Sequence, residues 1–327
     1  MIDELTRRQI LIQRFAGGQI ERTLPILRKL ATDLRNRLAA GNLTDFQAGR
    51  LSRLNADIGE IIAQSTAKMQ GVLQLDDFAD QEAAFAAKVL GGAVSVELAA
   101  VSPERLRAVA TQSRMVLGGN KRMTIPQAFD ELGGAVGRDA YRTLQAGIVE
   151  GKTQQQMTRE VYELVRTRTR RQVETVVRTA TNHVGAAARN EVFRANSDIL
   201  EGERYVATLD GRTTITCASL DGKVFALGEG PQPPLHYGCR AIRVPVIKAQ
   251  YRRGRVGERA SMDGPVDGRV TYGGFLKRQS KEFQDEALGP ERAALFRSGK
   301  VSITKFTDDR GRILTLDELA SKEGLSF

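Results

Sequence analysis

The chain has 327 residues, enough for about two domains of roughly 150 residues each, and it carries a net charge of +10. This positive balance favours contact with a polyanion. Aromatic residues make up only 6% of the chain and tryptophan is absent, which argues against a protein that stacks the bases of single-stranded nucleic acid. The two histidines leave little material for histidine-based catalysis. No apolar run approaches the roughly 18 residues that cross a bilayer, so we expect no membrane span.

The chain contains two cysteines, which cannot form a multi-disulfide framework. Assembly in a reducing cytoplasm is therefore expected. The N-terminal residues mix charges and lack the apolar core of a signal peptide, so classical secretion is not expected.

Residues 1–160 predict a helical N-terminal region. Apolar residues recur there every three or four positions, as on one face of a helix; Ile20, Leu24, Leu27, Leu34 and Leu38 are examples. A long helix with one apolar stripe is then predicted over Arg168–Asn196. Such helices must pack on one another or on another chain, and the pattern alone leaves both alternatives open.

The pattern changes near Glu203, and residues 203–247 predict a small β-rich insert. Strands are expected at 205–209, 223–225 and 241–246, and Pro245 favours an edge position for the last of these. About 45 residues of this kind build little core alone. The predicted fold class is therefore α+β, predominantly helical, with long amphipathic helices around this insert.

Residues 251–327 predict a basic linker followed by a helical C-terminal tail. Glycine, proline and arginine residues dominate up to Gly268, and helical spacing returns at 275–288 and 290–296. Thr315 and Glu318 have the spacing of a capping box, which predicts a final short helix.

Cys217, His236 and Cys239 are the candidate metal ligands of the insert. Two thiolates and an imidazole suit zinc, and a unit with little core would gain stability from it. A closed site needs a fourth ligand, for which Asp221 or water is available. Four alternatives stay open: buried thiols beside a core histidine, a Cys217–Cys239 disulfide, a cysteine nucleophile activated by His236, and a metal-dependent hydrolase centred on Cys217, His236 and Cys239.

Several motifs of the insert resemble the Mu F-like head-morphogenesis family of tailed bacteriophages. They are a strand ending in Asp210-Gly211-Arg212-Thr213, the run Cys217-Ala218-Ser219-Leu220-Asp221-Gly222-Lys223, and the closing run Pro233-Pro234-Leu235-His236-Tyr237-Gly238-Cys239-Arg240. The helix before the insert and parts of the tail extend the resemblance over about residues 165–320. It implies a head-morphogenesis domain at 161–250.

The chain departs from the family pattern at two positions. The family commonly has Cys-x-x-Cys where this chain has Thr214 before Cys217, and a further cysteine where this chain has Ala241. The resemblance thus implies a depleted metal site: no cofactor, or zinc. The chain retains four polar residues of the family pattern, Asp210, Arg212, Asp221 and Arg240, and they are expected to act as a scaffold in which Arg240 pairs with either aspartate. The simpler alternative is that these residues only form turns and salt bridges.

The resemblance implies a structural, non-enzymatic minor capsid protein in the virion, made in the host cytoplasm. It implies a place inside the head at the portal vertex and ejection with the DNA. The expected partners are the portal protein, the major capsid or scaffolding protein, phage DNA bound without sequence preference, and further copies of the chain in a homo-oligomer. No membrane is expected in the assembled head.

Two groups of arginines predict contact with DNA phosphates. They are Arg166, Arg168, Arg170 and Arg171 at the start of the long helix, and Arg252, Arg253 and Arg255 in the later linker. Such side chains neutralise phosphates without reading bases. This gives a rival hypothesis, a DNA-binding protein of packaging or genome delivery; a solvated helix face with a flexible linker is the alternative reading.

Overall fold

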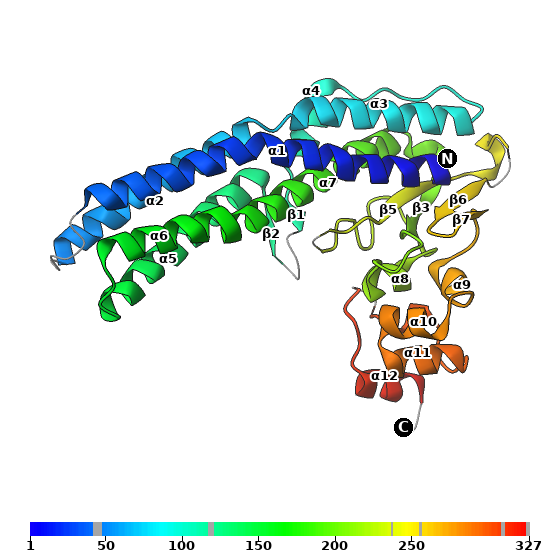
Figure 1. Ribbon diagram of the computed structural model, residues 1–327. Helices are drawn as coiled ribbons and strands as arrows, with labels where there is room; N and C mark the ends of the chain where they lie inside the picture. Colours follow the sequence, from blue (N-terminus) through cyan, green and yellow to red (C-terminus); the bar gives the residue numbers. More distant parts are fainter. Residues whose placement is uncertain (42–47, 117–120, 237, 255–256, 309–310, 325–327) are drawn as a thin grey trace. The chain divides into compact units, whose positions relative to one another are not determined.

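The computed structural model describes the chain except for residues 42–47, 117–120, 237, 255–256, 309–310 and 325–327. It is 65% helical with 10% strand, which confirms the predicted class, predominantly helical α+β (Figure 1). The chain forms two compact units, neither of them contiguous in sequence. We call them the helical unit (Gln13–Leu75 and Thr111–Thr181) and the mixed unit (Met1–Ile12, Asp76–Ala110 and Asn182–Phe327). The domain limits expected from the sequence stay a prediction.

The helical unit is built from long helices and one short hairpin. Its elements are α1 (Ile2–Ala40) from Gln13 onward, α2 (Ala48–Gly71), β1 (Met115–Val116), β2 (Arg122–Met123), α5 (Ile125–Val149), α6 (Gln154–Leu164), the π-helical turn η1 (Val165–Thr169) and the first part of α7 (Arg170–Ala195). Capping boxes at Thr124 and Thr153 start α5 and α6. They satisfy N–H groups that a helix start leaves without a partner, so they fix where both helices begin.

Buried apolar side chains hold the helical unit together. Those at most 1% exposed include Leu34, Leu38, Ile58, Ile62 and Leu144. The Gln154 side chain donates to the carbonyl oxygens of Leu38 and Ala39, both at 2.9 Å, and so caps the end of α1. The predicted single apolar stripe is therefore covered within the chain along this part of α1.

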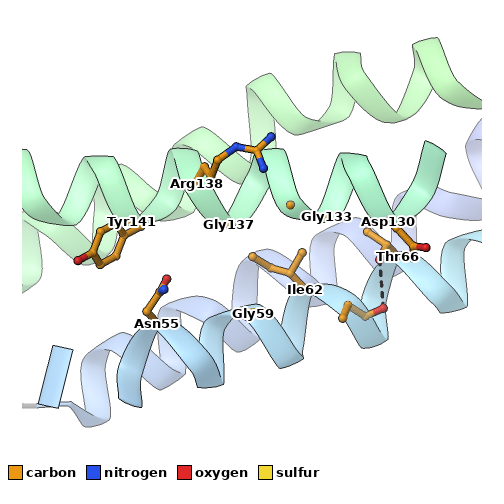
Figure 2. Close-up of a pocket in the computed structure, with 11 residues that line it drawn as sticks. Asn55, Gly59, Ile62, Thr66, Asp130, Gly133, Gly137, Arg138 and Tyr141 are labelled. Carbon is orange, nitrogen blue, oxygen red and sulfur yellow. Dashed lines mark hydrogen bonds between the residues drawn. The ribbon is translucent and has the colours of Figure 1, made fainter. Parts of the chain in front are cut away.

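Small residues let α2 and α5 approach closely. A Cβ atom at Gly133 would lie 3.3 Å from the Thr66 hydroxyl, closer than most such contacts. Figure 2 shows the pocket of about 420 Å³ between these helices, with Gly59 on one side and Gly133 and Gly137 on the other. Gly133 permits the close approach to Thr66, and the absence of side chains at Gly59 and Gly137 helps to leave this groove open.

A three-stranded antiparallel sheet forms the centre of the mixed unit. Its order is β4 (Val224–Phe225), β3 (Leu200–Val206) and β5 (Ile242–Ile247). Tyr205 faces Arg243 and Glu203 faces Pro245 across β3 and β5. Pro245 thus lies on an outer strand, as predicted. The strand predicted at 205–209 begins and ends earlier than expected, and Leu209 instead forms an isolated bridge with Ser261.

Further helices and a hairpin complete the mixed unit, beside the start of α1 up to Ile12 and the part of α7 from Asn182 onward. They are α3 (Leu75–Ala93), α4 (Pro103–Gln112), η2 (Ser197–Ile199), α8 (Ile215–Leu220), η3 (Ala249–Tyr251), β6 (Glu258–Ser261), β7 (Gly264–Asp267), α9 (Tyr272–Leu276), α10 (Lys281–Leu288), α11 (Pro290–Arg297), η4 (Ile303–Lys305) and α12 (Leu316–Glu323). The β6–β7 hairpin lies in the segment expected to be a linker. The capping box at Thr315 and Glu318 is confirmed.

The insert and the tail share their hydrophobic core. The cluster of the insert itself is small, and Tyr205, Cys217 and Cys239 are among its buried members. Leu209 and Ala218 instead join the larger core of the tail, with Tyr272 and Phe275. The insert is as poor in core as predicted, and the tail supplies apolar contacts that it lacks.

Three buried ion pairs tie elements of the mixed unit together. Arg189 of α7 binds Glu82 of α3 at 2.7 Å. Arg243 of β5 binds Glu203 of β3 at 3.3 Å, and the Arg243 guanidinium also lies 4.5 Å from the centre of the Phe225 ring. Arg259 of β6 binds Asp221, which directly follows α8. Each pair joins segments that lie far apart in the sequence.

Candidate metal centre and basic segments

Two short segments place the three candidate ligands. Cys217 lies on α8, whose first turn is capped by the Thr214 hydroxyl accepting from the Cys217 N–H. His236 and Cys239 lie in the loop between β4 and β5, where the Cys239 N–H donates to the His236 carbonyl at 3.1 Å. The Asn182 side chain of α7 donates to the Cys239 carbonyl at 3.4 Å. Helix, loop and α7 thus fix the ligand positions before any metal binds.

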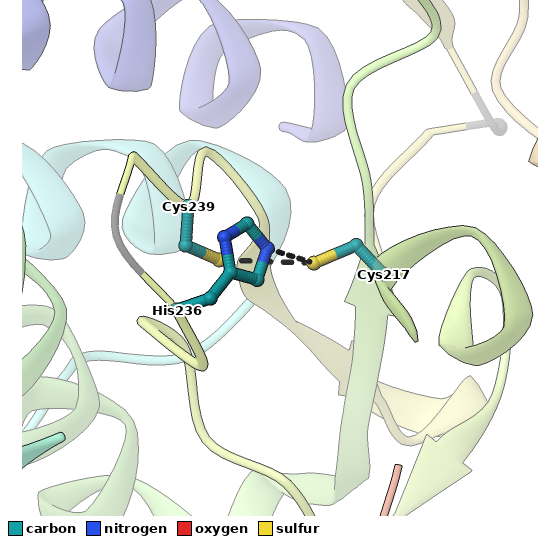
Figure 3. A group of neighbouring side chains, drawn as sticks. All are labelled: Cys217, His236 and Cys239. Atoms are coloured by element: carbon teal, nitrogen blue, oxygen red, sulfur yellow. Dashed lines mark hydrogen bonds between the residues drawn. The ribbon is translucent and has the colours of Figure 1, made fainter. Parts of the chain in front are cut away.

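The three ligand atoms lie within 4.8 Å of one another (Figure 3). Cys217 Sγ is 3.8 Å from Cys239 Sγ and 3.2 Å from His236 Nε2. Because Zn–S bonds measure about 2.3 Å, two sulfur ligands of a tetrahedral zinc lie about 3.8 Å apart. The sulfur spacing therefore fits zinc. The two sulfurs are not bonded to each other, since a disulfide S–S bond is about 2.05 Å long, and both cysteines are free.

Hydrogen bonding polarises the cysteine pair. The Cys217 thiol hydrogen-bonds to Cys239 and holds the pKa of Cys239 well below its usual range; burial opposes this, and His236 adds to it. The same hydrogen bond, together with burial, raises the pKa of Cys217. Burial also raises the pKa of Tyr205, whose hydroxyl lies 3.2 Å from Cys217 Sγ. Cys239 is accordingly the sulfur closest to the thiolate form that metals require.

Asp221 is not available as the fourth ligand. One carboxylate oxygen accepts from the Ala207 N–H and from Arg259, and the other accepts from Arg259 and the Tyr272 N–H. The Thr214 hydroxyl lies instead at the site, 3.0 Å from His236 Nε2. The adjoining pocket holds about 10 Å³, room for about one water. The donors present therefore fit a metal with three protein ligands and one water or hydroxyl oxygen.

Two other predicted scaffold residues, Arg212 and Arg240, line the same pocket. Arg240 pairs with Asp210, and its pKa is raised chiefly by that hydrogen bond. The Arg212 N–H donates to Asp210 Oδ1 at 3.0 Å. Of the two aspartates open to Arg240 in the sequence, Asp210 is the partner, while Asp221 binds Arg259. Sequence reasoning missed Arg259 because it lies in the segment expected to be a linker.

The predicted basic residues fall in both units. Arg166, Arg168 and Arg170 are exposed but paired, with Glu163, Asp139 and Glu174 respectively. Arg171 is exposed and has no ion pair among the residues that the structure describes. Arg166 and Arg168 lie in the π-helical turn η1, which the helical pattern did not predict.

The second basic group belongs to the mixed unit. Arg252 donates to the Ile247 carbonyl at 2.9 Å, and the Arg253 N–H donates to the Ala93 carbonyl. Arg255 lies outside the described residues.

Across the described ranges, no helix is both long and apolar enough to cross a membrane.

Comparison with known families gives a match for the central part of the chain. The model of the family described as Phage Mu protein F like protein matches residues 140–243. These residues run from α5 to β5 and include all three candidate ligands. No curated protein and no solved structure matches the chain. The resemblance seen in the insert is confirmed at the level of the family.

Proposed function

We propose that this chain, which is Mu F-like over residues 140–243, is a minor capsid protein at the portal vertex, inside the phage head. In this proposal its role is structural, its contacts are with the portal and a major capsid or scaffolding protein, and it leaves the head with the DNA. The family, which consists of structural head proteins, implies a non-enzymatic role in the virion.

The observation that carries the proposal is the construction of the matched segment. A long helix, α7, is joined through Asn182 to the loop that carries Cys239, and Cys217 and Cys239 share a buried cluster with Tyr205 of the small sheet. The pocket next to the cluster has room for about one water and for no larger substrate. This supports a scaffold and argues against the rival metal-dependent hydrolase.

Purified particles test the proposal. Virus lacking its own copy is complemented with an epitope-tagged chain, and full and DNA-emptied particles are compared by quantitative mass spectrometry after cross-linking. We expect the chain in full particles, cross-links to the portal protein, and depletion after DNA release. Absence from particles would overturn the proposal, and presence without portal cross-links would overturn the position at the portal.

DNA binding is the second candidate function, favoured by Arg171, the exposed arginine at the start of α7 that has no acidic partner among the described residues. If Arg171 binds a phosphate, Arg171→Ala should lower the slope of affinity against salt concentration, on logarithmic scales, by about one unit. Arg170→Ala is the matched control, since Arg170 already binds Glu174. This interaction would be ruled out if the affinity for duplex DNA does not depend on salt concentration, or if Arg171→Ala leaves that affinity unchanged.

We also propose a structural zinc ion at Cys217, His236 and Cys239. When bound, it would cross-link α8 to the loop before β5. Elemental analysis of protein purified without chelators should give about one zinc per chain, lost in Cys239→Ser. Thr214→Cys supplies a third thiolate beside His236, as a fourth protein ligand, and should tighten zinc binding. The site would be excluded if the purified protein contains no zinc and the Thr214→Cys variant does not bind zinc either.

A further inference from the structure

A second pocket of the mixed unit, of about 470 Å³, lies along β5. The end of α3 and the start of α1 contribute Val89, Gly92 and Ile2 to its walls. It is separate from the Cys217–His236–Cys239 cluster and shares no lining residue with the pocket there, among the residues described. The function proposed above gives it no role.

The pocket follows the free edge of the sheet. β5 is the last strand in the order β4-β3-β5, so its second edge is not paired with another strand in the described part of the chain. Four consecutive residues of β5, 244–247, line the pocket. Because successive side chains of a strand point to opposite faces, a pocket that touches all four must run beside the backbone. An extended segment is the shape that fits such an edge.

The charge of the pocket is strongly one-sided. Four basic residues line it, Lys88, Arg204, Arg252 and Arg253, against one acid, Glu4. None of the four basic side chains forms an ion pair with an acid among the residues described. Cations gathered without counter-charges favour an anionic occupant.

The remaining lining argues for a peptide. Valine, isoleucine, alanine and glycine line the pocket beside the cations, and no aromatic side chain lies among the described lining residues. Proteins that bind single-stranded nucleic acid commonly stack its bases on such rings, so a lining without them favours a peptide. Pro245 lacks an N–H, so the edge offers few backbone donors and the cations must supply most of the recognition.

We propose that this pocket binds an acidic peptide segment of a partner protein, held in extended conformation along the outer edge of β5. The carboxylates of the segment contact Lys88, Arg204, Arg252 and Arg253, and its apolar side chains pack on the valines. Arg252 and Arg253, which the sequence suggested for DNA, are thereby given a protein partner.

The full chain is tested with an array of octapeptides that alternate aspartate or glutamate with each apolar residue. The best binder, labelled with fluorescein, is then titrated by fluorescence anisotropy. Lys88→Glu/Arg253→Glu should weaken binding by at least about tenfold. The matched control, Lys300→Glu/Lys322→Glu, makes the same charge change at exposed sites outside the pocket and should leave affinity within about twofold. Peptide binding should also slow hydrogen exchange in residues 242–247.

Three outcomes would overturn the proposal. In the first, the chain binds no peptide of the array. In the second, the pocket variant and its control lose the same amount of peptide affinity. In the third, a duplex oligonucleotide displaces the peptide, and its own binding depends on Lys88 and Arg253. The last would make the pocket a nucleic-acid site. Urea unfolding of both variants confirms that they fold, and none of these outcomes depends on where the chain lies in the particle.

Discussion

Among the residues that the structure describes, the two units of this chain differ in whether they contain buried ion pairs. In the mixed unit, Arg259–Asp221 and Arg189–Glu82 are ion pairs whose side chains are at most 4% exposed. In the helical unit, pairs such as Lys29–Asp33 and Arg170–Glu174 lie at the surface, with the cations more than half exposed. Both units contain arginine and acidic residues, but these pairs are buried in the mixed unit and exposed to water in the helical unit.

This difference has an energetic consequence. Removing one partner of a buried pair leaves an uncompensated charge away from water and costs about 3–5 kcal/mol, whereas an exposed pair contributes about 0–1 kcal/mol. The mixed unit should therefore be sensitive to single substitutions in its buried ion pairs. The helical unit, which relies on apolar stripes, should be sensitive to changes in its core.

The largest expected effect is that of Asp221→Ala. It removes the partner of Arg259 and the acceptor of the Ala207 and Tyr272 N–H groups. We expect the free energy of unfolding of the mixed unit to fall by about 4 kcal/mol. Urea unfolding, followed by hydrogen exchange in peptides from residues 200–225, measures this.

Asp267→Ala is the control for Asp221→Ala. Asp267 also binds an arginine, Arg269, but both side chains are exposed, by 48% and 74%. The control should cost less than about 1 kcal/mol. Equal losses in the two variants would mean that burial does not distinguish these ion pairs, and the comparison of the units would fail.

The next effect tests the helical unit through its core. Leu144 on α5 is 1% exposed. Leu144→Ala should lower the free energy of unfolding by about 3 kcal/mol, because the lost methyl groups leave a cavity. Hydrogen exchange in α5 and α6 reports it. Val149→Ala, at a position 88% exposed near the end of the same helix, should change stability by less than about 0.5 kcal/mol.

A smaller, pH-dependent effect is expected at Asp210. Burial opposes its ionisation, but the hydrogen bonds and charge of Arg240 outweigh burial and lower its pKa. Because the pKa of Asp210 is lower in the folded than in the unfolded protein, its ionisation stabilises the fold at pH values above its unfolded-state pKa of about 3.9. This stabilisation is lost as the pH falls through the folded-state pKa. Asp210→Asn should therefore cost about 2 kcal/mol at pH 7 and progressively less below about pH 4.

Unfolding free energies of the parent chain and of Asp210→Asn, measured in urea from neutral pH down to about one unit below the unfolded pKa, give this difference. A difference in unfolding free energy that stays constant over that range would show that the ionisation of Asp210 does not contribute to stability. A difference that grows in acid would contradict the direction of the pKa shift.

The helical unit was predictable because its information is local. The spacing of Leu34 and Leu38 and the Thr153–Gln156 cap specify helices without reference to other segments. The candidate ligands Cys217, His236 and Cys239 could be named from residue type, and the structure brings them together. The residues that support them could not be named, because Arg259 and Asn182 reach this region from segments whose place depends on the whole fold.

The strand limits illustrate the same point. Residues 205–209 have the composition of a strand, but pairing with β5 selects Leu200–Val206 instead. The π-helical turn at Val165–Thr169 also had no local signal, since its residues fit an ordinary helix equally well. Composition thus indicates which element forms, while its partners decide where it begins and ends.

The smallest expected effect completes the comparison of the units. Arg170 and Glu174 lie one turn apart on α7 with their charged groups 3.0 Å apart, and their side chains are 52% and 32% exposed. Arg170→Ala should lower the free energy of unfolding by no more than about 0.5 kcal/mol, because water screens the pair and alanine is a good helix former. Glu174→Ala should give a similar value in the same urea measurement, and the double variant should show a coupling of about 0.3 kcal/mol. A loss of several kcal/mol in either single variant would mean that this face of α7 is buried against other residues, and the helical unit would then depend on specific charge pairs as the mixed unit does.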